Sequence, residues 1–166
     1  LLAHRSNGES RLAPVSDARI WVDDILGVMG PQDQVEAYAE RNRLGMSARL
    51  REFGELFNPS RAGIAEAVVP PNSNYIGKTL GDLRLRKRHG ISLLAVNRDR
   101  DVLRENLRDL TLRAGDMLVL HSSWQNLAES AAQKDFIVVT DYPKGEQRPH
   151  KFRIAMAIFA VTMLIA

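Results

Sequence analysis

The tripeptide Gly77-Lys78-Thr79 has the residue types with which a phosphate-binding P-loop ends. In that motif an earlier glycine lets backbone amides curl around the phosphates, and the lysine reaches the terminal ones. Here the earlier position holds Asn72, which follows two prolines, and a proline has no N–H to donate to a phosphate. The sequence therefore favours a structural role, in which Gly77 makes a tight turn and Thr79 helps to start a helix.

Other catalytic or metal-binding constellations are not recognisable in the sequence. The histidines are scattered and cysteine is absent, so neither the spacing nor the thiolates of a zinc site are found. Asp23, Asp24 and Asp33 lack the dense oxygen spacing of a calcium loop. No Ser-His-Asp or Cys-His set can be picked out. We therefore expect a chain that binds no metal and is not an enzyme.

The overall charge is mildly basic, with 23 Lys and Arg against 20 Asp and Glu, and the two signs are interspersed. Nucleic-acid binding would require the basic excess on one face with aromatic side chains between, and only 6% of the residues are aromatic. We expect no nucleic-acid partner. The absence of cysteine fits a reducing compartment.

Residues 154–166 carry no charged side chain and have no polar face around a helix. A helix that is apolar on all sides belongs in a bilayer or in a large core. The basic segment 141–153 precedes it, with Lys151 and Arg153 as candidate membrane anchors. We expect 154–166 to start a transmembrane helix, with residues 1–153 on the cytoplasmic side of the inner (plasma) membrane. A buried core helix is the alternative, which the short run would favour.

A shift of the sequence against itself by 92 residues brings two segments into register. Asp24 then meets Asp116, and both segments show an apolar strand, a polar turn, a second strand, an acidic turn, a third strand and a helix. This shared order predicts two copies of one module. The first copy, at 1–46, lacks its start, and the second occupies 63–140.

The second copy predicts an α+β module of the order β-α-β-β-β-α-β. Strands are predicted at 64–70, 91–98, 101–107, 116–122 and 135–140, and helices at 79–90 and 124–133. Gly90 would end the first helix, and Ser122 or Ser123 would cap the second. Between the copies, apolar residues at helical spacing predict that the linker 47–62 is an amphipathic helix.

The second copy resembles the C-terminal domain of TrkA and RCK proteins, the regulators of potassium channels and transporters. That family has a serine ahead of an apolar-Gly-Lys-Thr/Ser-Leu turn, a leucine-patterned helix, an apolar strand ending in arginine, and a late Gly-Asp turn. The matching residues are Ser73, Gly77, Lys78, Thr79, Gly90, Arg98, Gly115 and Asp116. Asn106 departs from the family, which usually has proline there, so the middle turn is expected to differ.

Two such domains ahead of a membrane span resemble the cytoplasmic loop of divalent anion:sodium symporters and citrate permeases. The resemblance implies a regulatory, ligand-sensing segment of a sodium-coupled dicarboxylate, sulfate or citrate-type permease. The alternative is a regulatory domain of a potassium or other cation transport system. The resemblance also implies that the domains pair, within one chain or between protomers of a dimer, around a cyclic dinucleotide or an ion.

A phosphate-bearing ligand at such an interface needs cations and apolar walls. Asn97, Arg98 and Arg100 at a strand end would supply the polar groups, with Arg5 as their counterpart in the first copy. Solvated turn residues are the alternative for these four. The basic run 84–88 is interpreted as a helix end whose charge suits the helix dipole, or as a surface attracted to anionic lipid.

Overall fold

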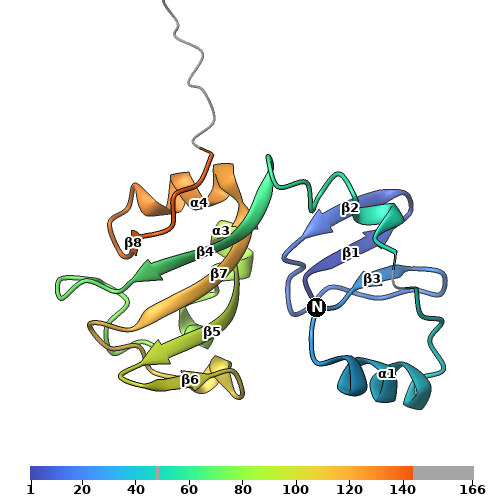
Figure 1. Ribbon diagram of the computed structural model, residues 1–166, viewed down its shortest axis with the longest axis horizontal. Coiled ribbons are helices and arrows are strands. Elements are labelled where there is room, and N and C mark those ends of the chain that lie inside the picture. Colours follow the sequence, from blue (N-terminus) through green and yellow to red (C-terminus); the bar gives the residue numbers. More distant parts are fainter. Residues whose placement is uncertain (48, 144–166) are drawn as a thin grey trace, which may run out of the picture.

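The computed structural model describes residues 1–47 and 49–143, which form two units joined by a linker (Figure 1). We call residues 1–46 the first unit and residues 62–142 the second unit. Each contains one antiparallel sheet, of three strands in the first unit and five in the second.

No helix within the described ranges is long and apolar enough to cross a membrane. The predicted membrane helix at 154–166 lies outside these ranges. The predicted anchors Lys151 and Arg153 lie outside them as well.

The first unit is a small sheet followed by one helix. β1 (Ala3–Ser6) lies between β2 (Glu9–Leu12) and β3 (Ile25–Gly27), and α1 (Gln32–Arg41) comes after them. The turn between β1 and β2 contains Asn7 at a positive φ of 51°, a conformation that asparagine adopts more readily than most residues.

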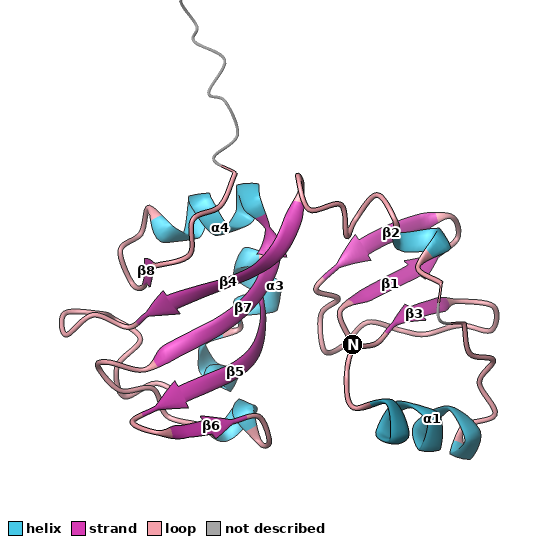
Figure 2. Ribbon diagram, in the orientation of Figure 1, coloured by secondary structure: helices cyan, strands magenta, loops and turns pink. Residues whose placement is uncertain are grey.

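The second unit is an α+β fold, with a sheet in the order β6-β5-β7-β4-β8 and helices packed on one of its faces (Figure 2). Its strands are β4 (Ala62–Val68), β5 (Ser92–Arg98), β6 (Asp101–Leu103), β7 (Met117–Ser123) and β8 (Ile137–Val138). Its helices are α2 (Leu80–Leu83), α3 (Leu85–His89) and α4 (Trp124–Ala131), with a 3-10 turn η2 (Leu107–Asp109).

The core of the second unit lies between β7 and the helices. Leu118 and Leu120 of β7 are buried there, together with Leu83, Leu85 and Leu127 from α2, α3 and α4. Burial of one such side chain contributes roughly 1.5–3 kcal/mol, so this cluster is what holds the short helices on the sheet.

The single helix predicted at 79–90 is wrong, because the chain breaks at Arg84 into α2 and α3. Arg84 takes a left-handed conformation with φ of 49°. Residues two apart point to different sides of a continuous helix, so Leu83 and Leu85 could not both reach the core. The break at Arg84 lets both be buried.

Three further predictions are corrected in extent. The predicted strand 101–107 ends at Leu103, because Asn106 takes a positive φ of 50° and starts η2. The predicted strand 135–140 is reduced to the two residues of β8. The predicted linker helix is reduced to the 3-10 turn η1 (Arg51–Phe53) and further turns. Phe53 packs toward β3 of the first unit and Phe57 toward His121 of the second.

The elements of the two units occur at the spacing seen in the sequence. β1, β2, β3 and α1 fall 92 residues before β5, β6, β7 and α4, and the strand order β2-β1-β3 parallels β6-β5-β7. The turns also correspond, because Asp23 and Gly115, at equivalent positions, both have positive φ, 72° and 85°.

Candidate functional site

The turn that contains Gly77, Lys78 and Thr79 is hydrogen-bonded to the segment between η2 and β7. Gly77, at a positive φ of 77°, donates its N–H to the carbonyl of Leu112, and the N–H of Leu112 donates to the carbonyl of Lys78. Thr79 caps α2 by accepting a hydrogen bond from the N–H of Asp82 at 3.2 Å. These contacts give the tripeptide a role in the fold.

Two other motif residues also hold turns in place. The hydroxyl of Ser73 donates to the carbonyl of Asp135 at 2.6 Å and so ties the turn to the segment that enters β8. Gly90 ends α3 at a positive φ of 63°, and an added Cβ there would come within 2.4 Å of the Asn126 side chain. The position therefore requires glycine.

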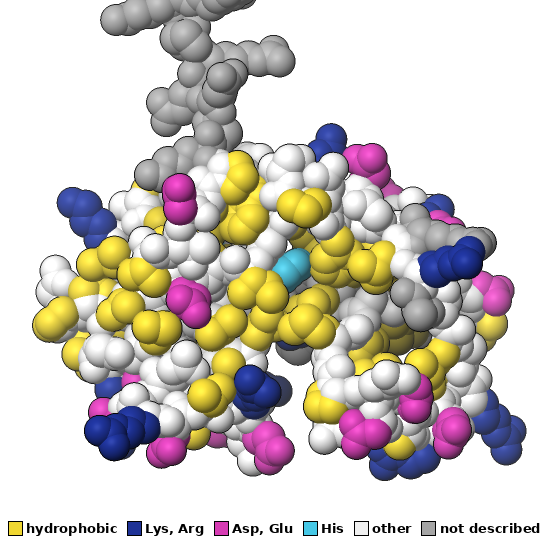
Figure 3. All heavy atoms as spheres, viewed as in Figure 1, with side chains coloured by type: hydrophobic (Ala, Val, Ile, Leu, Met, Phe, Trp, Pro, Cys, Tyr) yellow, Lys and Arg dark blue, Asp and Glu magenta, His cyan; other side chains and the backbone are white. Residues whose placement is uncertain are grey.

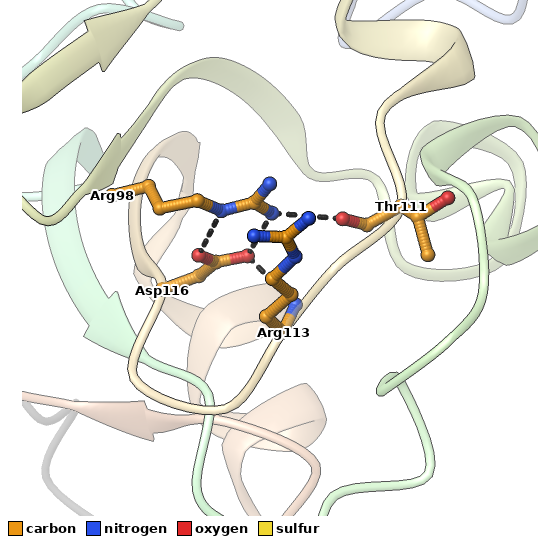
Figure 4. Close-up of polar contacts among 4 residues, drawn as sticks. All are labelled: Arg98, Thr111, Arg113 and Asp116. Atoms are coloured by element: carbon orange, nitrogen blue, oxygen red, sulfur yellow. Dashed lines mark hydrogen bonds and ion pairs between the residues drawn. The ribbon is translucent and has the colours of Figure 1, made fainter.

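Arg98 and Asp116 form a buried ion pair (Figure 4). Arg98 donates from Nε to Oδ1 at 2.8 Å and from Nη2 to Oδ2 at 2.7 Å, and Nη2 also donates to the carbonyl of Thr111. The N–H of Arg113 gives Asp116 a further hydrogen bond at 2.8 Å. Burial alone would raise the pKa of Asp116, but these donors outweigh it and lower the pKa below its ordinary value.

The first unit has a similar anchor at Asp24. Its Oδ2 accepts the N–H of Trp21 at 2.8 Å, the counterpart of the bond from Arg113 to Asp116, and it contacts Nε2 of His4 at 2.8 Å. The N–H of Trp21, then the Ser6 hydroxyl and His4, lower the pKa of Asp24. In both units an aspartate therefore ties the turn before a strand to the neighbouring strand.

The four residues predicted to bind a ligand do not form one cluster. Arg5 pairs with Glu52 of the linker, whereas Arg98 is engaged by Asp116. Asn97 Nδ2 lies 3.8 Å from the sulfur of Met117, and Arg100 is exposed in the turn between β5 and β6. Within the described ranges, no hydrogen bond or ion pair joins Arg5 to the other three.

The linker places two aromatic side chains between the units. Phe53 is buried against β3, where an added Cβ on Gly27 would lie 3.4 Å from its ring. The ring of Phe57 meets that of Phe53 edge-on at 6.2 Å and that of His121 on β7 at 5.3 Å. Hydrophobic side chains line both sides of this seam in Figure 3. The aromatic contacts therefore link the two sheets through the linker.

A cleft of about 470 Å³ is lined by residues of both units. The first unit contributes residues 15–17, and the second contributes α2, α3 and η2. The basic residues of 84–88 were visible in the sequence, but their place in a cleft was not. That place depends on the break at Arg84 and on the turn at η2, neither of which has a clear sequence signal.

The chain is similar to one domain family and to several transporters. Residues 64–133 match the TrkA-C domain family. A transporter of Synechocystis, sll0640, is 29% identical over 160 residues, covering 92% of this chain and 26% of that protein. Sodium/sulfate cotransporter 2 of Chlamydomonas reinhardtii is 22% identical over 156 residues, covering 90% of this chain and 16% of that protein. The chain thus spans about a quarter or less of these relatives.

Among solved structures, the RCK C domain of the potassium transport protein KtrA, in complex with cyclic diadenosine monophosphate, is similar with a TM-score of 0.41. The identity is 22%, and the match covers 53% of this chain and 99% of that domain. The family match to residues 64–133 lies within the β-α-β-β-β-α-β unit described above. The second unit of this chain thus contains the segment that matches the TrkA-C domain family.

Proposed function

We propose that this chain is a regulatory segment of a membrane transporter of the sodium-coupled anion type, acting by a change of conformation and not by catalysis. The observation that carries the proposal is the match to the Synechocystis transporter, since 92% of this chain must include most of both units and the linker. The named function of the Chlamydomonas relative, sodium/sulfate cotransport, supports an anion as the transported substrate.

We also propose that the first unit is the later part of another TrkA-C module, in addition to the one in the second unit. Ile20, Val28 and Leu44 are 55%, 45% and 45% exposed, although their counterparts 92 residues later are buried. Those counterparts are Leu112, Leu120 and Phe136. In the second unit, residues 62–79 cover all three. Gly77 donates a hydrogen bond to Leu112, Ala65 pairs with Leu120 across the strands, and the ring of Tyr75 contacts that of Phe136. The described part of the first unit contains no equivalent of that segment.

The mechanism we propose couples the two modules through the linker. A ligand held between them, such as a cyclic dinucleotide or an ion, would favour one arrangement, and the chain leading into the membrane would transmit it. Regulation of this kind requires that the ligand bind more tightly to one transporter state than to another. The pairing would occur within one chain or between two protomers, on the cytoplasmic side of the inner membrane.

The test is anion uptake by the transporter that contains this chain, in sealed vesicles. Replacement of residues 1–143 by a flexible Gly/Ser linker should leave the transporter inserted but change the KM or maximal rate of sodium-dependent uptake. Phe57→Ala, which removes the ring between the sheets, should reproduce part of that change, and Tyr38→Ala on the exposed face of α1 is the matched control. Unchanged uptake kinetics after the replacement would refute a regulatory role.

A further inference from the structure

We propose that the cleft between the first unit and helices α2 and α3 is a binding site for a small aliphatic dicarboxylate. The biological role of this site rests on the proposed function, because the dicarboxylate would be the ligand that the paired units sense. The binding itself is a property of the described residues and is tested without any transport measurement.

The cleft is built from parts of the chain that are distant in sequence. Val15 and Ser16 of the first unit face α2, α3 and η2 of the second. Leu107 and Arg108 of η2 are the counterparts of Val15 and Ser16 at the 92-residue spacing, so equivalent segments of the two units meet here. A ligand that touches both walls would change how the units sit together.

The charge of the lining is strongly positive. Arg84, Arg86, Lys87 and Arg108 line the cleft, and Asp17 is the one carboxylate among its lining residues. No ion pair joins any of the four cations to a carboxylate in the described part of the chain. Arg86 is only partly exposed, and its burial lowers the pKa of its guanidinium. A partly buried, unpaired guanidinium is costly, and an anionic ligand would compensate it.

The remainder of the lining is aliphatic. Leu85 and Ile91 are buried beneath the cleft, and Leu80, Leu93 and Leu107 are partly buried around it. No aromatic ring is among the described residues that line it, so these offer no platform for stacking a nucleotide base. A volume of about 470 Å³ exceeds what an inorganic anion fills and lies within the range of small-molecule pockets. Cations from two segments over an aliphatic floor therefore fit two carboxylates joined by methylenes.

The experiment is isothermal titration calorimetry on residues 1–166 at fixed ionic strength, with succinate, glutarate, adipate and sulfate as probes. Each methylene buried on the aliphatic floor contributes about 0.8 kcal/mol, so affinity should rise about fourfold per methylene from succinate to adipate. Arg86→Gln and Arg108→Gln should each weaken adipate binding about tenfold. Arg104→Gln, which removes the same charge from an exposed arginine outside the cleft, is the matched control.

Three outcomes would overturn the site. The first is that sulfate binds as tightly as adipate, and the second is that Arg104→Gln weakens adipate binding as much as the cleft variants do. The third is that no saturable adipate binding is seen up to about 10 mM, which is well above the millimolar dissociation constants of weak ligands. Circular dichroism and the unfolding midpoint of each variant verify that it remains folded. If adipate does not bind, the regulatory role still stands, because that role is tested by uptake kinetics. If the uptake test fails, the binding site still stands, because it is tested by calorimetry.

Discussion

Removal of the Asp116 carboxylate tests whether the Arg98–Asp116 pair holds the second unit together. In Asp116→Asn the side chain keeps its shape but loses its charge, so the bidentate contact with Arg98 and the bond from the Arg113 N–H weaken. The Asp116 side chain is 2% exposed and that of Arg98 is 17% exposed. Breaking a buried pair costs about 3–5 kcal/mol, and the residual exposure of Arg98 places the expected loss near 3 kcal/mol.

The assay is thermal unfolding of the chain at neutral pH, followed by circular dichroism. For a chain of this size, a loss of about 3 kcal/mol lowers the unfolding midpoint by about 6–12 °C. The control is Glu55→Ala, which breaks the exposed Arg61–Glu55 pair and should cost less than about 1 kcal/mol. Equal shifts in the two variants would refute the buried-pair reasoning.

The same variant should alter the acid limb of stability. The pKa of Asp116 is lower in the folded chain than in the unfolded one. Its contribution is therefore present above the unfolded value, about 3.9, and is lost as the pH falls through the folded value. Asp116→Asn should flatten the loss of stability below about pH 4, and an unchanged acid limb would contradict this assignment.

Three further changes should each affect one local feature. Burial lowers the pKa of His121, so stability should fall as the pH drops below about 6.5, and His121→Leu should remove that slope in urea unfolding. Gly63→Ala would place a Cβ 2.4 Å from the ring of Trp124, so we expect a loss of about 1–3 kcal/mol and a changed tryptophan emission. Arg84→Gly should stabilise the chain by up to about 1 kcal/mol, because it relieves a left-handed φ, whereas Lys87→Gly within α3 should cost about as much.

Local signals in the sequence were enough to predict several helices and strands of the second unit. The alternation and β-branching of β4, the apolar run of β5 and the serine before α4 each act over a few residues, and the structure has these elements close to the predicted bounds. The cap at Thr79 is equally local, because its partner Asp82 is three residues away. Such features are set by the chain itself and need no tertiary contact to be recognised.

The misses share a physical cause, which is that tertiary packing overrode a local pattern. Leu85 does not fit the helical spacing of the other leucines in 79–90. The break at Arg84 is explained by packing, because it allows both Leu83 and Leu85 to be buried in the core. Arg98 looked like a free cation because its partner Asp116 lies 18 residues away. The aromatic spacing of the linker mimicked a helix, although Phe53 and Phe57 belong to the packing of two different sheets.

Buried polar atoms are found on β5 and β7, one of them beside the linker. Three buried side-chain atoms have no hydrogen-bond partner in the described structure: Ser92 Oγ, Asn97 Oδ1 and His121 Nδ1. Ser92 and His121 are register partners on β5 and β7, and the His121 ring meets Phe57 of the linker. Buried polar atoms are almost always satisfied, so ordered water is expected beside Ser92 and His121. The aromatic contacts of the linker thus join the two units at one point, and a buried polar pair on β5 and β7 lies next to it.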